Sequence, residues 1–402
     1  MSACACQVQP EIGDSPTRIV TIVHGTYARH AKWMQDGQRL PDALGEPDGT
    51  LLRRFCWRGR NRHADRAEAA IELRAVLVDL TTRHPAAEHH VVAHSHGGNV
   101  VLDAVSGGGE ALRGVTVTTL GTPFLSMKPR PVSKKVLAFA TFVSVVFVAN
   151  LVELLATERP FDSATDWIWL AYYGLWTLVA FLAITFFATS ASMYRRATDV
   201  GWWDLLRGRS VDSEAGRVTA RPIDDERLFI VTAQGDEAAA LLGAGQLASW
   251  ILKKTLAGSG SRATVWILGL AFVLALLLPE SGVVSWIPVV PIILIPLFIF
   301  SLTFSYLPFG IDMLFWSLHA DVTAGPAPQG YSAGFQAGGA IGDGLSHSAY
   351  DDPEVIGVVA ARVDSLRESA ASNAIDGPTD VGTANHADVD DPQPSAGDAR
   401  HR

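Results

Sequence analysis

The sequence predicts an α/β fold with a mostly parallel, doubly wound sheet, into which two apolar helical hairpins in a membrane are inserted. Buried-strand patterns alternate with helical patterns in residues 17–127, and this alternation is typical of a parallel sheet covered by helices. The chain of 402 residues is 48% hydrophobic and only 18% charged, and its mean hydropathy is positive. The apolar excess is concentrated in four runs, each near or above the length that crosses a bilayer.

The first expected strand covers residues 18–23, an apolar, β-branched run that leads directly into His24-Gly25-Thr26. A glycine-containing loop after an early strand can present backbone N–H groups to the oxyanion that develops during acyl transfer. We assign that role to the amide of Thr26, with Gly25 as the alternative, and pair it with the amide of His96. The competing interpretation is a plain strand-end turn with His24 packed beneath it.

The next elements continue the alternation. Residues 51–57 form the second expected strand, and residues 115–120 form a later one that ends in a Gly-Thr-Pro-Phe loop bordering the pocket. Between them lies an amphipathic helix, residues 65–83, whose apolar face is formed by Ala69, Leu73, Val76, Leu77 and Leu80.

The segment 91–101 is the centre of the prediction. An apolar run ends at Ser95, two glycines follow, and a helical pattern begins. This is the strand, sharp turn and helix of a nucleophile elbow, which exposes a serine hydroxyl at its apex and needs small neighbours because its backbone is strained. Ala93 stands where the G-x-S-x-G pattern has its first glycine. The alternative is an ordinary strand-to-helix turn in which Ser95 is a local cap.

Three motifs together resemble one family. They are His-Gly-Thr after the first strand, Ala-His-Ser-His-Gly-Gly-Asn at the elbow, and Leu-Gly-Thr-Pro at the end of residues 115–120. With these three motifs, the part of the chain outside the four apolar runs resembles the α/β-hydrolase superfamily, in its lipase-like branch. The resemblance implies the α/β-hydrolase fold and a serine hydrolase that cleaves carboxylic esters with Ser95. It also implies that a catalytic acid and then a histidine follow the serine.

The expected acid is Asp236. Residues 228–233 have a buried-strand pattern, and Asp236 lies just beyond their carboxyl end, where it would orient the histidine and stabilise the imidazolium. Glu237 is the substitute candidate. The alternative is that Asp236 only caps a helix that starts at Glu237.

The expected general base is His347, in the glycine- and serine-rich segment 342–350 before a last helix at 353–366. A base that works near neutral pH must be free to accept the serine proton, and this suits a loop. The segment is similar to the H-S-x-Y segment of lipase-like hydrolases, which carries the base. The competing histidines are His319, which adjoins a membrane run, and His94 and His96, which flank the serine.

Four histidines near the elbow also raise the question of a metal site: His89, His90, His94 and His96. A metal site needs side chains that converge, whereas positions 94 and 96 straddle a turn. We therefore expect no metal, and the absence of a phosphate loop or dinucleotide motif from the sequence leads us to expect no other cofactor. His90 and His94 are interpreted as core or loop histidines.

Charge and cysteine content bear on other classes of protein. The net charge is −9, much of the acid lies in the C-terminal tail, and no basic patch interleaved with aromatic residues predicts nucleic acid binding. The three cysteines, Cys4, Cys6 and Cys56, predict no disulfide framework. Residues 1–16 and 370–402 are expected to be flexible, because they carry too few large apolar residues to offset the entropy of ordering.

The four apolar runs are residues 136–157, 167–190, 264–278 and 283–307. The third stops at Pro279 and the fourth contains three prolines, so this pair is expected to be kinked or partly re-entrant. The alternative for each run is a buried lid helix of a soluble lipase.

The runs divide the chain into core parts and inserted hairpins. The hairpins are residues 128–196, at the lid position, and 259–318; the core parts are residues 17–127, 197–258 and 319–369. Both ends of each hairpin must lie on the side of the core. Among the charged residues that flank the hairpins, Arg159 is the one positive residue on the far side of the membrane. The positive residues on the side of the core are Lys128, Arg130, Lys134, Lys135, Arg195, Arg196, Lys253, Lys254 and Arg262.

Because positive flanks stay cytoplasmic, the catalytic domain is expected to face the cytoplasm. We predict an integral, multi-pass membrane protein, of the bacterial inner membrane type. Its substrate would be a lipid ester that reaches Ser95 from the bilayer, since the first hairpin occupies the lid position. The alternatives are a catalytically inactive hydrolase-fold scaffold or sensor, a hydrolase of soluble esters or thioesters, and a secreted antibacterial lipase effector.

Overall fold

The computed structural model forms two compact units, Met1–Ala360 and Ala361–Arg402. All strands and the candidate site lie in the first unit, and the described part of the second is the C-terminal portion of the last helix. The residues that the structure describes are 16–29, 31–45, 49–129, 223–233, 309–313, 320–328, 334–337 and 349–375, with residues 152, 185, 189, 192, 219, 247 and 331.

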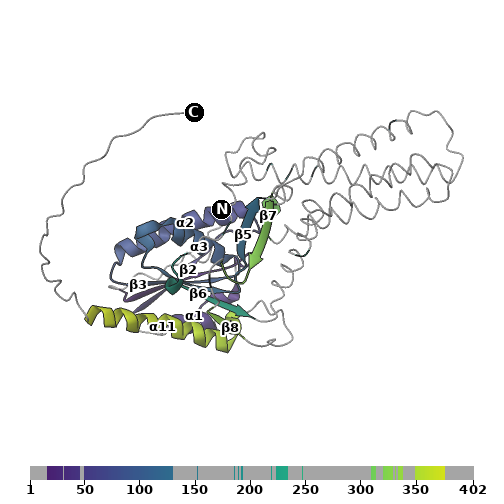
Figure 1. Cartoon of the computed structure of the whole chain (residues 1–402). Coiled ribbons are helices and arrows are strands. Elements are labelled where there is room, and N and C mark those ends of the chain that lie inside the picture. The colour runs from purple at the N-terminus through teal and green to yellow at the C-terminus, as the bar shows by residue number, and fades with distance from the viewer. Residues whose placement is uncertain are drawn as a thin grey trace, which may run out of the picture. The chain divides into compact units, whose positions relative to one another are not determined.

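Within the described residues, the main sheet has six strands in the order β2-β1-β3-β4-β6-β8, and every neighbouring pair is parallel (Figure 1). This confirms the predicted mostly parallel sheet. Strands β1 and β3 are buried along almost their whole length, because helices cover both faces of a parallel sheet. The bounds are β1 (Arg18–Val23), β2 (Thr50–Phe55), β3 (Glu88–His94), β4 (Thr116–Leu120), β6 (Leu228–Ala233) and β8 (Phe335–Ala337).

Helices lie on both faces of this sheet. Figure 1 shows α2 and α3 on one face and α1 on the other, as right-handed crossovers require when the chain moves in opposite directions along the sheet. The helices are α1 (Arg39–Gly45), α2 (His63–Arg83), α3 (Gly97–Gly107) and α11 (Pro353–Ile375), with 3-10 turns η2 (Lys32–Met34), η3 (Gly109–Leu112), η4 (Asp225–Arg227) and η8 (Ala349–Asp351).

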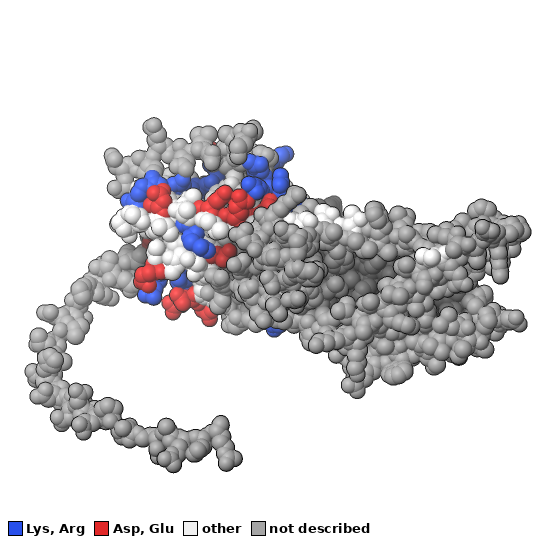
Figure 2. Space-filling view, turned by 90° about the horizontal axis from the view of Figure 1, so that it is seen from above, with Lys and Arg blue, Asp and Glu red and all other residues white. Residues whose placement is uncertain are grey.

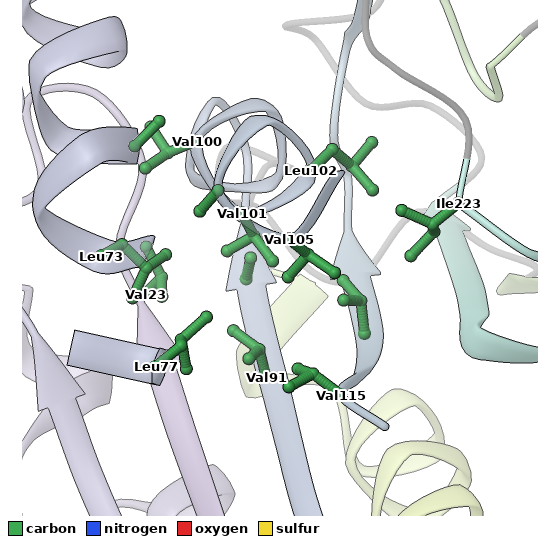
Figure 3. Close-up of a cluster of buried hydrophobic side chains, with 14 of the residues drawn as sticks. Val23, Leu73, Leu77, Val91, Val100, Val101, Leu102, Val105, Val115 and Ile223 are labelled. Carbon is green, nitrogen blue, oxygen red and sulfur yellow. The ribbon is translucent and has the colours of Figure 1, made fainter. Parts of the chain in front are cut away.

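The largest described core lies between α2, α3 and the sheet (Figure 3). Leu73 and Leu77 of α2 meet Val101 and Val105 of α3 over the sheet residue Val91, and all five are at most 2% exposed. The predicted apolar face of α2 is confirmed at Ala69, Leu73, Leu77 and Leu80, whereas Val76 is only half-buried.

The chain reverses its direction along the sheet between β1 and β3. From β1 it passes to the edge strand β2, then returns over β1 to β3 and continues through β4 to β6 and β8. Ligands of open α/β sheets bind beyond the carboxyl ends of the strands at such a switch point. The loop after β1 and the turn after β3 meet there, and these two segments carry His24 and Ser95.

A two-stranded antiparallel ribbon, which the sequence patterns did not predict, joins segments far apart in the chain. Strand β5 (Phe124–Pro129) pairs with β7 (Ala320–Gly325) so that Pro129 faces Ala320. Thr219 also bonds to β5, since the amide of Met127 donates to its Oγ1 at 3.1 Å. The core therefore brings together three segments that are distant in the sequence: β5, which ends at Pro129, Thr219, and β7, which begins at Ala320.

A second tie joins the segment Phe309–Met313 to the first turn of α2. Asp312 is 1% exposed, and its two carboxylate oxygens accept hydrogen bonds from the amides of His63 and Ala64, both at 2.9 Å. An acceptor at this end of a helix satisfies donors that have no partner within the helix. Arg66 donates to the carbonyl of Phe309, and burial lowers the pKa of Arg66 to about 10 while Asp312 acts in the opposite direction.

The four apolar runs lie outside the described residues apart from three isolated positions, Val152, Thr185 and Thr189. Among the helices of the described part, none is long and apolar enough to span a bilayer. Cys56, directly after β2, is disulfide-bonded, a bond that the sequence patterns did not predict. Cys4 and Cys6 lie outside the described residues.

Candidate active site

Ser95 has a left-handed backbone conformation, with φ at 53°. A non-glycine residue is rarely found in this region and costs free energy there unless its surroundings fix it. Ser95 follows the last residue of β3 and precedes α3 by one residue, so it forms the sharp apex between strand and helix. The prediction of a strained strand-turn-helix at Ser95 is confirmed as a matter of geometry.

The strained apex is held by bonds from the neighbouring strand. The Ser95 amide donates to the carbonyl of Leu120 at 2.9 Å, and the Ser95 carbonyl accepts from the Thr122 hydroxyl at 2.9 Å and from the Gly98 amide at 3.0 Å. The N–H and the C=O of Ser95 itself are thus both hydrogen-bonded inside the protein. Ser95 is 6% exposed.

Two glycines after Ser95 allow the apex to pack closely. A Cβ added to Gly97 would lie 2.6 Å from the carbonyl oxygen of His24, and one added to Gly98 would lie 2.2 Å from Oγ1 of Thr122. Real side chains do not approach this closely, so the absence of a Cβ lets the turn after β3 fit against the loop after β1 at Gly97 and against Thr122, after β4, at Gly98. The first contact joins the two segments that meet at the switch point.

Asn99, in the first turn of α3, fastens the start of β5 to the elbow. Its Nδ2 donates to the Pro123 carbonyl at 2.9 Å, and its Oδ1 accepts from the Leu125 amide at 3.3 Å. The sequence patterns gave Asn99 no role. Through Asn99, β5 is hydrogen-bonded to α3, the helix that begins two residues after Ser95.

The loop after β1 lies directly against the serine. A Cβ added to Gly25 would be 2.7 Å from Cβ and 3.2 Å from Oγ of Ser95. The Thr26 amide donates no backbone hydrogen bond to another described residue. Gly25 thus lies against Ser95, and the predicted oxyanion donors Thr26 and His96 directly follow these two residues in the chain.

His24 is fully buried beneath this loop. Its Nδ1 lies 2.7 Å from the Gly25 carbonyl oxygen, and its Nε2 lies 3.2 Å from the amide nitrogen of Trp57. The Trp57 ring stacks on the imidazole at 5.6 Å with an interplanar angle of 7°, and its Nε1 donates to the His24 carbonyl at 2.8 Å. The expected strand 51–57 ends at Phe55 instead, because Trp57 leaves the sheet to cover His24.

His94 lies on the other side of the serine in an aromatic cluster. Its ring meets the ring of Tyr350 edge-on at 4.8 Å and the ring of Trp33 at 5.9 Å, and those two rings stack at 5.0 Å. Tyr350 belongs to η8, so a segment from the end of the chain's core returns to the carboxyl edge of β3. Next to it, burial raises the pKa of Asp351, partly opposed by Arg39.

The other predicted histidine of the core is also bonded within the sheet. His90 lies 2.6 Å from Thr116 Oγ1 through Nδ1 and 3.0 Å from Thr118 Oγ1 through Nε2. It is thus a satisfied core histidine, as predicted. In the described ranges, no three His, Cys, Asp or Glu side chains are grouped so that they could hold a metal ion.

The proposed acid Asp236 and base His347 lie outside the described residues, as do the alternatives Glu237 and His319; the other competing histidines, His94 and His96, are described. The strand before the acid is described, and β6 ends at Ala233, at the same edge of the sheet as β3. Two contacts of the loop after β2 were not predicted from the sequence: Trp57 packs on His24, and the carbonyl of Gly59 accepts a hydrogen bond from the Tyr27 amide. The tryptophan and the glycine just beyond the strand were a signal for the contact of Trp57, whereas nothing in the sequence marked Tyr27.

The described surface gives no single-sign charge on the face seen in Figure 2, where acidic and basic side chains are mixed. Arg58, next to Trp57 in the chain, and Glu68 form an exposed ion pair at 2.7 Å. Such pairs contribute little to stability. This face therefore supplies no argument for a strongly charged partner.

No protein-family model matches the chain, and no curated protein sequence matches it. Three solved structures are similar in part: an iodinated complex of acetyl xylan esterase, a cutinase-like protein from Cryptococcus sp., and an acetylxylan esterase. Their sequence identities are 13%, 14% and 13%, each with a TM-score of 0.23, over 27%, 27% and 28% of this chain. The chain spans 64%, 55% and 66% of the lengths of those structures.

A likeness of this extent carries no conclusion about activity. The fold and the site themselves define a doubly wound α/β protein with a strained serine at the switch point of its sheet.

Proposed function

We propose that the protein is a serine hydrolase of the α/β-hydrolase type that cleaves carboxylic esters through an acyl-enzyme. The observation that carries the proposal is the backbone of Ser95, which is left-handed, bonded on both sides and placed between a parallel strand and a helix N-terminus. Local strain that the surrounding structure maintains is concentrated at functional sites. A nucleophile elbow needs this geometry, whereas a helix cap does not.

In the first step of the proposed reaction, Oγ of Ser95 attacks the ester carbonyl carbon while its proton passes to His347. The carbonyl oxygen becomes an oxyanion, which accepts hydrogen bonds from the amides of Thr26 and His96. The bond to the alcohol oxygen then breaks, and the alcohol leaves with the proton from His347. In the second step, water attacks the acyl-enzyme with the same base, and the carboxylic acid leaves while Ser95 regains its proton. Asp236 orients His347 throughout.

The position of Tyr350 supports His347 as the base. Tyr350 lies 4.8 Å ring to ring from His94, the residue before the serine. His347 precedes Tyr350 by three positions, and three steps of chain span at most about 11 Å. This short connection supports the proposal that His347 acts at the carboxyl edge of β3.

The position of β6 supports Asp236 as the acid. β6 is parallel to β4, which is parallel to β3, so the carboxyl ends of all three strands lie at one edge of the sheet. Asp236 follows the last residue of β6 by three positions. One strand separates the two loops, a spacing that suits an acid and a serine joined through a histidine.

The contacts of β5 with α3, β7 and Thr219 support the proposal that the substrate reaches Ser95 from a membrane. Strand β5 is bonded to α3 through Asn99, pairs with β7, and bonds to Thr219. The apolar runs follow and precede these residues in the chain, so they would start beside the serine and act as its lid. We therefore propose lipid esters as the substrate class, the first two apolar runs as a membrane hairpin, and a cytoplasmic catalytic domain.

Labelling with a fluorophosphonate probe tests the activity. The full chain in detergent should be labelled, and Ser95→Ala and His347→Ala should abolish labelling. Ser106→Ala is the matched control, because Ser106 lies on α3, the helix that follows Ser95, and its hydroxyl bonds within the helix, to the carbonyl of Asp103. A well-folded wild-type protein that resists labelling would favour the scaffold hypothesis instead.

The acid is tested by exchange of carboxylate for amide. Asp236→Asn should reduce turnover by several orders of magnitude, as loss of the acid does in triads generally, whereas Asp343→Asn should leave it near the wild-type value. Loss of turnover on Glu237→Gln, with Asp236→Asn active, would transfer the role to the neighbouring glutamate.

Reporter fusions test the proposed orientation separately. A reporter inserted after Arg159 should lie outside the cytoplasm, and one fused at Arg402 should lie in it, because positive flanks are retained on the cytoplasmic side. The reverse pattern would contradict the orientation without affecting the catalytic proposal.

A further inference from the structure

His24 is the most deeply buried polar side chain at the site, with 0% exposure, yet the proposed reaction does not use it. We propose that His24 is a positioning residue of the oxyanion hole, which it holds in place together with Trp57. The inference rests on the proposed function, since it assigns a task to one of the two oxyanion donors.

The hydrogen bonds fix the protonation of the His24 ring. A backbone amide can only donate, so Nε2 must accept the hydrogen bond from the Trp57 amide. A carbonyl can only accept, so Nδ1 must carry the proton and donate to the Gly25 carbonyl. His24 is therefore a neutral imidazole with its proton on Nδ1, and both ring nitrogens are used.

The Gly25 carbonyl and the Thr26 amide belong to the same peptide unit. A trans peptide is planar, and its C=O and N–H point in opposite directions. The described residues contain no cis peptide bond. When His24 holds the carbonyl oxygen of Gly25 at 2.7 Å, it also sets the direction of the Thr26 N–H, which points away from the buried imidazole.

Trp57 in turn fixes His24. Its amide, its indole Nε1 and its ring face all contact His24, so the imidazole can neither turn over nor move away from the loop. Gly59 extends this support, since its carbonyl accepts from the Tyr27 amide at 2.7 Å. The loop after β2 thus holds both the peptide before Thr26 and the residue after it.

An oxyanion donor must be aimed before the charge develops, because that pre-orientation is the source of its catalytic effect. The loop after β1 has no regular secondary structure to aim its amides. A bond from a buried side chain to the partner carbonyl supplies the missing constraint. This explains why a polar, fully bonded side chain fills a position that an apolar one could fill without requiring hydrogen bonds.

Two variants separate the two bonds of His24. In His24→Asn, the side-chain Nδ2 is the same number of bonds from Cα as Nδ1 of histidine, so it can donate to Gly25 while the Trp57 amide loses its acceptor. In His24→Gln, Oε1 can replace Nε2 as the acceptor from Trp57, while the bond to Gly25 is lost. Each variant loses one hydrogen bond, so a purely structural role predicts similar behaviour of the two.

The expected result is a difference in kcat. With p-nitrophenyl butyrate as the probe and the full chain in detergent, His24→Gln should lose about 10²-fold in kcat with little change in KM, the effect of removing one oxyanion donor. His24→Asn should retain at least about a tenth of the wild-type kcat, since it keeps the peptide in place. Equal kcat values in the two variants would overturn the inference.

An inhibitor that forms a tetrahedral adduct gives a second readout. A butyl trifluoromethyl ketone places an oxyanion in the hole, so its affinity should fall in His24→Gln by a factor similar to that of kcat. Butyrate carries no tetrahedral oxyanion, and its inhibition constant should not change. An affinity for the ketone that stays at the wild-type value in His24→Gln would also contradict the inference.

His90→Asn is the matched control. His90 is another buried histidine that bonds through both ring nitrogens, but it lies near the opposite end of β3. Its replacement should lower the melting temperature without lowering kcat. A fall in kcat for His90→Asn equal to that for His24→Gln would show that loss of a buried histidine acts through general destabilisation, and would overturn the inference.

A measurement on the wild-type protein keeps the proposal testable if the variants do not fold. Nitrogen chemical shifts of the ¹⁵N-labelled histidines should show His24 protonated on Nδ1 and unprotonated on Nε2. The opposite tautomer would overturn the inference. Failure of the proposed function is recognised separately, because wild-type protein would then show neither fluorophosphonate labelling nor ester turnover.

Discussion

The two ends of strands β1 and β3 differ in how their residues are held. At the amino ends, Arg18 and Glu88 form an ion pair at 3.2 Å and His90 bonds to threonines of β4, all in ordinary extended backbone. At the carboxyl ends, Ser95 and Tyr27 have left-handed backbone, and they are the non-glycine residues of the described part that do.

The difference indicates where function lies. Ordinary bonds at the amino ends stabilise the sheet, whereas the carboxyl ends maintain strain and glycine contacts that stability alone does not require. The two strained residues also differ from each other. Ser95 is 6% exposed and bonded on both sides, while Tyr27 is 84% exposed and its amide bonds to Gly59.

The largest expected effect comes from a methyl group between the two turns. Gly97→Ala would place its Cβ 2.6 Å from the backbone oxygen of His24, which cannot move aside as a flexible side chain could. We expect a loss of about 1–3 kcal/mol in the free energy of unfolding, and loss of fluorophosphonate labelling. Urea unfolding and labelling measure the two effects.

Gly114→Ala is the control for this change, because an added Cβ there meets no atom within 4 Å. It should change stability by less than about 0.5 kcal/mol. Wild-type labelling and stability in Gly97→Ala would show that the two turns can separate without consequence.

The next effect concerns the hydroxyl that supports the elbow. Thr122→Val removes the donor to the Ser95 carbonyl and keeps nearly the same side-chain volume. The expected loss is about 1 kcal/mol, the net value of one buried hydrogen bond, together with a lower rate of fluorophosphonate labelling. Thr116→Val at the amino end should cost a similar amount of stability, since its hydroxyl bonds to His90, but should leave the labelling rate unchanged.

A smaller effect separates strain from chemistry at Ser95. Ser95→Gly and Ser95→Ala should both be inactive, but the glycine variant should be the more stable by about 1 kcal/mol, because an L-residue pays this cost in left-handed backbone. Melting temperatures of the two inactive variants measure the difference. A more stable alanine variant would mean that the backbone at residue 95 is not strained in solution.

The smallest effect lies at the amino end and depends on pH. Burial lowers the pKa of His89, with a bond to the His84 carbonyl acting in the opposite direction. Because the folded-state pKa is below the unfolded value of about 6.5, the contribution is present above that pH and is lost as the pH falls through the folded pKa. It should amount to less than about 1 kcal/mol, because the bond to the His84 carbonyl offsets part of the effect of burial.

His89→Gln should therefore flatten the fall in stability below pH 6.5 while leaving turnover at pH 8 unaltered. An identical pH profile of unfolding in the variant and the wild type would assign that fall to other groups.

Much of the carboxyl edge could be predicted because its signals are local. The run from Val91 to Val101 contains a buried strand, a serine, two glycines and a helix start in one short stretch, and the structure has these elements in these places. Strand β1 begins and ends at the predicted residues, Arg18 and Val23. Each of these inferences depended on residues a few positions apart.

Other parts could not be predicted because their partners are distant. The β5–β7 ribbon pairs residues almost 200 positions apart, as Ser126 and Thr323 do. Asp312 caps α2 from 248 positions away, and no helix-start signal near His63 could point to it. Trp57 was assigned to a strand by its composition, whereas its contacts with His24 hold it outside the sheet.

The sequence by itself determined the core elements from β1 to β4 apart from α1, the apolar face of α2 and the serine turn, because these depend on propensities and periodicities that act over one or two turns of chain. Only the tertiary structure decided which loops meet at the switch point, that Ser95 is held in left-handed backbone, and that His24 bonds to Gly25 with its proton on Nδ1. Those features require strand order, side-chain packing and hydrogen bonds between distant segments, and such contacts form only when the whole sheet is assembled.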